Sequence, residues 1–189
     1  MRNIPSSFRQ LQREAGVWKE NQDAFLEDIT PRAGQEDAIE AIARLTEHEA
    51  RIVILTGESR SGKTYLLSGY MNDILRDIWG TDKQIKTPKF MTFFELELAL
   101  RAAQTKGTMD VLFRDLVDLP QLVIDEVGRG KWSDFTSTFF TNLLIRRFGE
   151  KRETLMATNL MGGELVEMLD IALIERLKED RAIIPIRKL

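Results

Sequence analysis

The sequence contains no cysteine and only one histidine, and it has no long uninterrupted run of apolar residues. The absence of cysteine excludes a disulfide framework and a zinc site built on thiolates. The single histidine, His48, stands among Glu47, Glu49 and Arg51, so we expect a solvated side chain rather than a ligand. Because the N-terminus is polar and no apolar run reaches spanning length, we expect no signal peptide, no membrane contact and a soluble, cytoplasmic protein.

Length and composition predict one domain preceded by a short arm. With 189 residues, of which 43% are hydrophobic, the chain can bury a single core of ordinary size. We place the main domain at residues 34–189 and the arm at residues 1–33. The apolar residues of the arm are too sparse for a core of its own. We therefore expect one or two short helices that either dock on the main domain or are held by a partner.

Charge is distributed unevenly along the chain. The net charge is −3, yet residues 1–50 carry six Lys and Arg against ten Asp and Glu, whereas residues 127–152, which include Arg146 and Arg147, carry six against two. A clustered basic surface on an acidic protein is typical of local contact with nucleic-acid phosphates. Solvated helix faces explain the same residues equally well. The candidate DNA-binding residues are Lys83, Lys86, Lys89, Arg129 and Lys131.

Strand-like apolar runs alternate with helical patterns from residue 34 onward, which predicts a parallel sheet covered by helices. We expect strands at 51–56, 88–93, 121–126, 153–159 and 182–186. We expect helices at 34–45, 65–78, 94–103, 109–117, 134–148, 164–169 and 170–177. Pro185 removes one donor from the ladder, which predicts that the last strand lies at an edge of the sheet.

Residues 57–64 have the spacing G-x-x-x-x-G-K-T of a phosphate-binding loop. A β-branched strand precedes the loop and a helix follows it, so backbone N–H groups and the helix N-terminus can surround phosphate oxygens. In this prediction Lys63 contacts the β- and γ-phosphates of a nucleoside triphosphate, and Thr64 binds Mg²⁺ through its hydroxyl. A chance match on a surface loop is the alternative. The predicted nucleotide-binding residues are Gly57, Glu58, Ser59, Arg60, Ser61, Gly62, Lys63, Thr64 and Tyr65.

Asp125 and Glu126 end the apolar strand that follows Pro120. In a parallel sheet, ligands bind at the carboxyl ends of the strands, so we expect Asp125 near the Mg²⁺ that Thr64 holds. Glu126 can act as the general base for an attacking water, which indicates hydrolysis of the triphosphate. The alternative is an acidic pair at the end of an ordinary surface strand.

Two further polar residues follow apolar segments. Asn159 ends the expected strand 153–159, where its amide can bind the attacking water or the γ-phosphate; the alternative is a helix N-cap. Arg176 lies near the end of a short helix. From there it can stabilise transition-state charge in the site of a neighbouring subunit. A solvated surface arginine is the alternative.

Together these elements resemble the AAA+ ATPases, and more narrowly the helicase loaders of the DnaC and DnaI type with the related IstB transposition ATPases. The matching stretches are Leu55–Thr64, Leu122–Gly128, Ala157–Leu160 and Ile174–Leu177, within residues 34–189. The resemblance implies a three-layer α/β fold with a parallel five-stranded sheet of order 5-1-4-3-2. It also implies that Asn159 is the sensor-1 residue and Arg176 the arginine finger. Finally, it implies ATP-dependent head-to-tail self-association, contact with single-stranded DNA and an N-terminal arm that grips the replicative helicase.

The chain also departs from this family pattern. Ala172 stands where the family often has another arginine, four residues before Arg176, and no helical lid follows the last expected strand. Many family members have a longer or zinc-binding N-terminal domain, whereas this arm is short. Three other functions stay open: a transposition regulator that recruits a transposase to DNA, a P-loop kinase for a small molecule, and a scaffold that only binds ATP.

Overall fold

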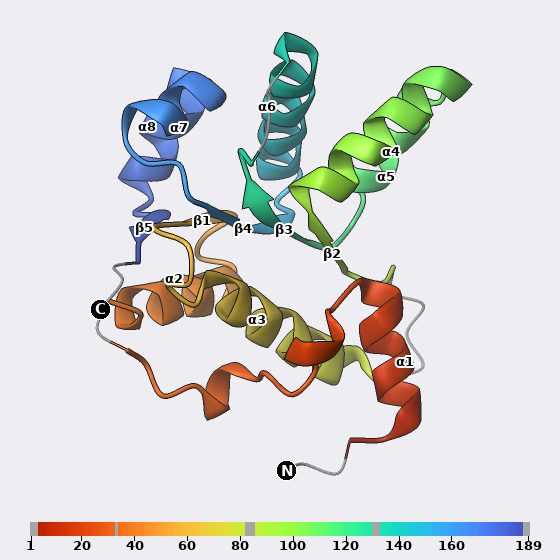
Figure 1. Cartoon of the computed structure of the whole chain (residues 1–189), viewed down its shortest axis with the longest axis vertical. Coiled ribbons are helices and arrows are strands. Elements are labelled where there is room, and N and C mark those ends of the chain that lie inside the picture. The colour runs from red at the N-terminus through yellow and green to blue at the C-terminus, as the bar shows by residue number, and fades with distance from the viewer. Residues whose placement is uncertain (1–3, 33, 82–85, 130–132, 187–189) are drawn as a thin grey trace.

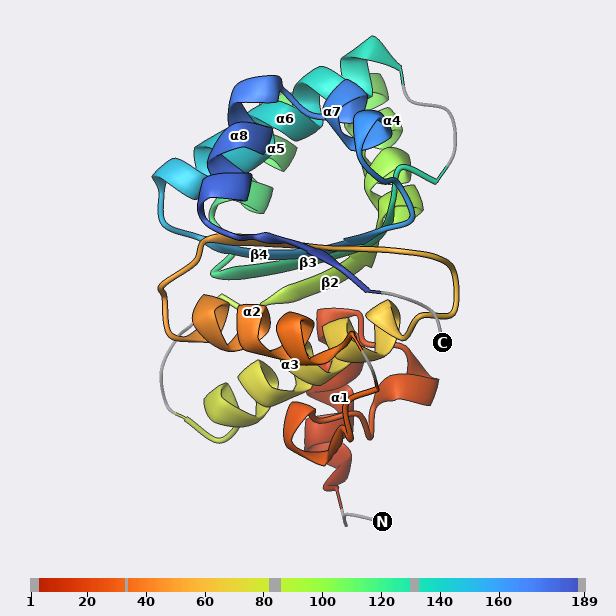
Figure 2. The same cartoon turned by 90° about the vertical axis from the view of Figure 1, so that its left-hand side faces the viewer.

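The computed structural model describes residues 4–32, 34–81, 86–129 and 133–186. A five-stranded sheet lies between two layers of helices (Figures 1 and 2). The strands are β1 (Ile52–Thr56), β2 (Lys89–Thr92), β3 (Gln121–Val127), β4 (Glu153–Thr158) and β5 (Ile183–Pro185). Neighbouring strands pair in parallel, in the order β2-β3-β4-β1-β5. This confirms the predicted order 5-1-4-3-2 and the edge position of the strand that contains Pro185.

The helices divide between the two faces of the sheet, as Figure 2 shows. One face is covered by α1 (Ser6–Ala15), α2 (Glu36–Thr46) and α3 (Lys63–Ile78). The other is covered by α4 (Phe93–Lys106), α5 (Met109–Val117), α6 (Asp134–Gly149), α7 (Gly163–Met168) and α8 (Ile171–Glu179). The short 3₁₀ turns η1 (Lys19–Asn21) and η2 (Leu26–Asp28) connect α1 to α2. Within the described residues, no helix combines the length and the apolar character needed to cross a membrane.

Local signals set the helix ends close to where the sequence predicts them. At the start of α4, the Thr92 hydroxyl accepts from the Glu95 N–H at 3.2 Å, and the Glu95 carboxylate accepts from the Thr92 N–H at 2.6 Å. This capping box satisfies two donors that a helix start leaves free. The same helix ends at Gly107, which adopts a φ of 66° that a residue with a side chain rarely takes.

The sheet has an apolar core on each face because its strands are buried on both sides. All five residues of β1 are buried. Ile52 and Ile54 belong to the core under α4–α8, whereas Val53 and Leu55 belong to the core under α1–α3. A parallel sheet with two covered faces requires such a continuous apolar run rather than alternation.

The arm docks on the main domain. Of the two arrangements expected from the sequence, docking or being held by a partner, the structure shows docking. Its Phe8 and Phe25 are buried in the same core as α2 and α3. Buried amides join it to α3: Gln12 Nε2 donates to Asn72 Oδ1 at 2.8 Å, and Asn72 Nδ2 donates to the Ala24 carbonyl at 2.6 Å. The sparse apolar residues of the arm therefore complete a core that the main domain supplies.

Candidate nucleotide-binding site

The predicted phosphate loop runs from the end of β1 to the start of α3 and requires an unusual backbone. Gly57, Arg60 and Gly62 have φ values of 141°, 68° and 92°. A methyl group on Gly57 would lie 2.1 Å from the Ile186 carbonyl oxygen, so the loop start has no room for a side chain. These angles turn the chain sharply enough for the helix to start at Lys63. The loop therefore has the strand–turn–helix context that phosphate binding needs.

Lys63 lies buried at the centre of this loop, only 7% exposed. Its Nζ donates to the Gly57 carbonyl at 2.6 Å, the Glu58 carbonyl at 2.7 Å and the Ser61 hydroxyl at 3.3 Å. Burial lowers the pKa of Lys63, and the negative charge of Asp125 opposes this shift. The ammonium is therefore held where it can donate hydrogen bonds to the phosphate oxygens of a bound nucleotide.

Thr64 and Asp125 come from different elements and meet at the carboxyl end of the sheet. The Thr64 hydroxyl donates to Asp125 Oδ2 at 2.6 Å, and Asp125 is 2% exposed. Burial raises the pKa of Asp125, while hydrogen bonds from the Thr64 hydroxyl and the Glu126 N–H oppose this shift. A hydroxyl and a carboxylate are hard oxygen donors, which Mg²⁺ prefers. The described residues offer no cluster of three His, Cys, Asp or Glu for a metal. Mg²⁺ at this pair would therefore take its remaining ligands from phosphate and water.

Glu126 and Asn159 lie beside this pair. The main cleft, of about 370 Å³, is lined by the loop, Asp125, Glu126 and Asn159. Glu126 has a φ of 55°, and its carboxylate forms an ion pair with Arg129. Asn159 is exposed and does not cap a helix, because α7 begins at Gly163 with Gly162 as its N-cap. The N-cap alternative for Asn159 is therefore wrong.

A second compartment adjoins the main cleft and shares Gly62 and Tyr65 with it. This compartment, of about 320 Å³, is also lined by Asp28, Ile29 and Thr30. From the sequence we expect the segment 25–31 to flank the adenine ring. Phe25 is only 2% exposed and packs in the core, so the later residues of the segment are the ones that face this compartment.

Several residues of the site were missed in the sequence. Trp18, Glu20 and Asn21 of the arm line the main cleft. Gln35 lies behind the loop: its Nε2 donates to the Ser61 carbonyl at 2.9 Å and its Oε1 accepts from the Arg32 N–H at 3.0 Å. The only signal for Gln35 is a polar residue directly before the amphipathic α2. The sequence offers no signal for the arm residues, because their position depends on docking.

Arg176 lies outside this cleft, on the exposed face of α8. Its guanidinium carbon is 4.8 Å from the centre of the Phe148 ring. Together they line a groove of about 450 Å³ that Glu175 and Glu179 share. Arg176 therefore does not line the cleft at Lys63, and its exposed position makes it accessible to another molecule.

Each of the three candidate DNA-binding residues that the structure describes contacts a different part of the chain. Lys86 Nζ is 3.5 Å from Asp115 Oδ1, Lys89 Nζ donates to the Glu14 carbonyl at 3.3 Å, and Arg129 pairs with Glu126. Lys83 and Lys131 lie outside the described residues. Arg147, which we counted in the basic stretch 127–152, is fully buried. Counting Arg147 as part of a basic surface was wrong, because composition alone cannot distinguish a buried arginine from an exposed one.

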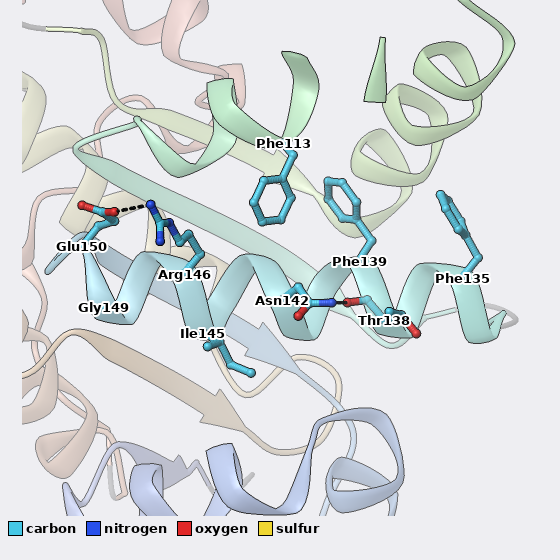
Figure 3. Close-up of a pocket in the computed structure, with 9 residues that line it drawn as sticks. All are labelled: Phe113, Phe135, Thr138, Phe139, Asn142, Ile145, Arg146, Gly149 and Glu150. Atoms are coloured by element: carbon cyan, nitrogen blue, oxygen red, sulfur yellow. Dashed lines mark hydrogen bonds and ion pairs between the residues drawn. The ribbon is translucent and has the colours of Figure 1, made fainter. Parts of the chain in front are cut away.

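A larger hollow, of about 770 Å³, lies between α5 and α6. Phe113 and Phe139 line it and meet edge to face, with their ring centres 5.4 Å apart (Figure 3). Phe135 and Ile145 of α6 also line it, and the Arg146–Glu150 ion pair lies at one end. None of the phosphate-loop residues line this hollow. The phosphate-loop residues therefore line the smaller cleft at Lys63 and not this larger hollow.

Comparison with known proteins bears on the fold and on the family that the chain resembles. No protein-family model matches the chain. In sequence it is similar to the replicative helicase loader DnaC of Escherichia coli (strain K12), with 26% identity over 127 residues that cover 66% of this chain and 49% of that protein. The chain thus spans about half the length of the curated relatives it matches.

Solved structures show the same fold. A crystal structure of the DnaC helicase loader has a TM-score of 0.69 with 18% identity, over 89% of this chain and 99% of that chain. The replication initiator DnaA bound to AMPPCP and single-stranded DNA has a TM-score of 0.72 with 16% identity, over 88% of this chain and 50% of that chain. The AAA+ P-loop fold and the resemblance to DnaC-type proteins, both expected from the motifs, are confirmed.

Proposed function

From its AAA+ fold and its resemblance to the DnaC-type helicase loaders, we propose that this chain is an ATP-hydrolysing replication protein that loads a replicative helicase. One observation supports hydrolysis above all: Lys63, Thr64, Asp125, Glu126 and Asn159, from three separate segments, line one cleft at the carboxyl ends of the strands. A protein that only binds ATP needs neither a candidate general base such as Glu126 nor an amide such as Asn159 beside the phosphates.

Each side chain has a role in this proposal. Lys63 and the N–H groups of the loop bind the β- and γ-phosphates. Thr64 and Asp125 hold Mg²⁺, which neutralises charge on the phosphates. Glu126 accepts a proton from the attacking water once its carboxylate leaves Arg129, and Asn159 orients that water or the γ-phosphate. Tyr65 and Ile29 flank the adenine side.

Glu126→Gln tests the role of the base. The substitution preserves size but removes the proton acceptor, so the hydrolysis rate should fall by about 10²–10⁴-fold. ATP affinity, measured with a fluorescent analogue, should stay within a few-fold of the wild type because Lys63 and the loop are intact. A variant that hydrolyses ATP at the wild-type rate would rule out this role for Glu126.

Self-association belongs to the same proposal, with Arg176 of one subunit acting on the nucleotide of the next. Arg176→Ala should lower the rate by ~10³–10⁵-fold while the monomer still binds ATP. The matched control is Lys178→Ala, which removes an exposed cation from the same helix. Mixing Arg176→Ala with Glu126→Gln protein should restore part of the activity, because mixed assemblies contain sites with both groups. A mixture as inactive as its components would contradict action between subunits.

The partners follow from the relatives. DnaC is named a replicative helicase loader, and the DnaA structure contains single-stranded DNA. We assign helicase binding to the outer face of α1, where Gln10 and Arg13 are exposed. We assign DNA contact to the five candidate residues Lys83, Lys86, Lys89, Arg129 and Lys131. Size-exclusion chromatography with an ATP analogue, with and without single-stranded DNA and a hexameric helicase, tests these partners. Co-elution with a transposase in place of the helicase would favour the transposition regulator.

A further inference from the structure

β3 contains an irregularity at its two acidic residues. Ile124 pairs with Met156 and Val127 pairs with Thr158, so β3 has two residues where β4 has one. Glu126 adopts its φ of 55° within this bulge, and its N–H donates to Asp125 Oδ1 at 2.7 Å instead of to a strand. A bulge re-aims side chains that a regular strand would place on opposite faces. Here it lets consecutive acids, Asp125 and Glu126, line the same cleft.

Thr158 holds the residue that follows the bulge. Its hydroxyl donates to the Val127 carbonyl at 2.6 Å and accepts from the Leu160 N–H at 3.0 Å. Thr158 is 1% exposed; its bond to Val127 is fully buried, and its bond from Leu160 is partly buried. One hydroxyl thus ties the chain just after Glu126 to the chain on either side of Asn159.

A second contact reinforces the first. Leu160 packs so closely on Gly128 that a methyl group there would lie 2.4 Å from Leu160 Cδ1. Gly128 has a φ of 84°, which also disfavours a side chain. Glu126 and Asn159 are the residues next to these two contacts, and both line the main cleft and the small hollow of about 290 Å³ beside it.

We infer that Thr158 is a positioning residue: its hydroxyl holds the β3 bulge so that the Glu126 carboxylate and the Asn159 amide face the γ-phosphate region together. Thr158 itself transfers no proton. The inference rests on the proposed hydrolysis by Glu126, and it adds that the geometry of the base depends on a hydroxyl on the neighbouring strand. Displacing a reacting group by about 1 Å can cost 10²-fold in rate, so the effect should be large.

The test compares Thr158→Val, which keeps the shape but removes the hydroxyl, with Thr158→Ser, which keeps the hydroxyl. We expect kcat for ATP hydrolysis to fall on the order of 10²-fold in Thr158→Val and to recover to within a few-fold of wild type in Thr158→Ser. The affinity for an ATP analogue should stay within a few-fold of the wild type in both, because Lys63 and the other side chains of the loop are unaltered.

Thr154→Val is the matched control. Thr154 lies on the same strand, is also fully buried, and its hydroxyl accepts from Arg147 Nε at 2.9 Å at the opposite end of β4. It should lose stability without a change in kcat at a temperature where the protein is folded. If Thr158→Val and Thr154→Val lower kcat equally, or if Thr158→Val keeps the wild-type kcat, the inference is overturned.

Two further variants make the outcome decisive. If Thr158→Val does not fold, Leu160→Ala takes its place: it removes the contact with Gly128 from a partly exposed position. This variant should lower kcat and leave the affinity for the ATP analogue unchanged. A wild-type kcat would overturn the inference. Glu126→Gln separates this inference from the proposed function. An active Glu126→Gln protein refutes the proposed base, whereas an inactive one together with a fully active Thr158→Val refutes only the role of Thr158.

Discussion

The polar groups at the two ends of the sheet differ in burial and in pairing. At the carboxyl ends, Glu126 and Asn159 reach solvent, and the backbone adopts positive φ at Arg60 and Glu126. At the amino ends, Arg147 is fully buried and donates to the Leu116 carbonyl at 2.6 Å, the Leu119 carbonyl at 2.8 Å and the Thr154 hydroxyl at 2.9 Å. The carboxyl end therefore leaves two polar side chains accessible, whereas Arg147 at the amino end is buried and hydrogen-bonded through all three of its side-chain nitrogens.

Glu153, also at the amino end of the sheet, has partners for both of its carboxylate oxygens. Its carboxylate accepts from the Tyr70 hydroxyl at 2.7 Å and from Gln121 Nε2 at 3.2 Å. His48 Nδ1 is 2.7 Å from its other oxygen, so the one histidine is exposed, as expected, but also paired. A satisfied buried network makes one structure unique, whereas strained and accessible groups mark functional sites. Position in the fold, rather than residue type, therefore decides which polar side chains are buried and paired and which stay accessible.

Arg147→Met should produce the largest change in stability. Burial in the first place, and then the charge of Arg152, lowers the pKa of Arg147 to about 9, so the guanidinium stays protonated at neutral pH. Removing it leaves buried carbonyls without donors, and the free energy of unfolding should fall by about 3–5 kcal/mol. Urea denaturation measures this loss. ATP affinity of the folded variant should not change.

Arg146→Met is the control for this prediction. Arg146 is the preceding residue of α6, but it is exposed and pairs with Glu150 at 2.9 Å on the surface. Its removal should cost less than about 1 kcal/mol. Equal losses in the two variants would show that the buried network contributes no more than a surface ion pair.

Asp125→Asn should have a smaller effect of opposite sign. Burial raises the pKa of Asp125, which means that the folded protein disfavours the charged carboxylate. Replacing it with a neutral amide should therefore stabilise the fold by roughly 0.5–2 kcal/mol at pH 7. A raised pKa adds stability at and below the unfolded value of 3.8, and this contribution is lost as the pH rises through the folded pKa. The advantage of Asn should therefore be greatest near pH 7 and disappear towards pH 4.

Thermal unfolding across this pH range checks the prediction for Asp125, with Mg²⁺-dependent hydrolysis, which should be lost, as a second measurement. Asp110→Asn is the control, because Asp110 is exposed and pairs with Arg114 at 2.7 Å on the surface. A variant that is less stable than wild type at pH 7 would show that the hydrogen bonds from Thr64 and Glu126 outweigh the cost of burial.

Arg129→Ala should change stability least, by less than about 1 kcal/mol, because its pair with Glu126 is exposed. If Arg129 contacts a DNA phosphate, the variant should bind single-stranded DNA more weakly, and the slope of log affinity against log salt should fall by about 1. Fluorescence anisotropy at several salt concentrations measures both. Arg114→Ala, which removes another exposed arginine of an ion pair, should leave the slope unchanged. An unchanged slope for Arg129→Ala would remove Arg129 from the DNA contacts.

The sequence predicts much of this fold because local patterns determine much of it. The buried parallel strands appear as apolar runs, and the helix at 109–117 is found with its predicted bounds. The loop at 57–64 could be identified because its function requires glycine, lysine and threonine at fixed spacing. Asp125 could be placed beside Thr64, 61 residues away in the chain, because parallel strands bring their carboxyl ends together.

What the sequence could not predict depends on contacts between distant residues. The β3 bulge changes no spacing within the strand, so its pattern of residues looks regular. The pairing of Gln12 with Asn72 joins residues 60 apart, and neither residue type indicates burial. Arg147 looks like its neighbour Arg146 until the carbonyls around it are known. The assignments of Glu126, Asn159 and Arg176 to catalytic roles stay predictions, which the variants above test.

The closeness of the arm to β2 has a consequence for how the protein can be handled. A methyl group on Gly16 would lie 2.1 Å from the Phe90 carbonyl oxygen, and the Trp18 ring lies 6.3 Å from that of Phe90, so this segment covers part of an outermost strand. Strands left open at a sheet margin tend to pair with other molecules. A truncated protein that begins at residue 34 would lose this cover together with Phe8 and Phe25, and it should precipitate at concentrations that the full chain tolerates.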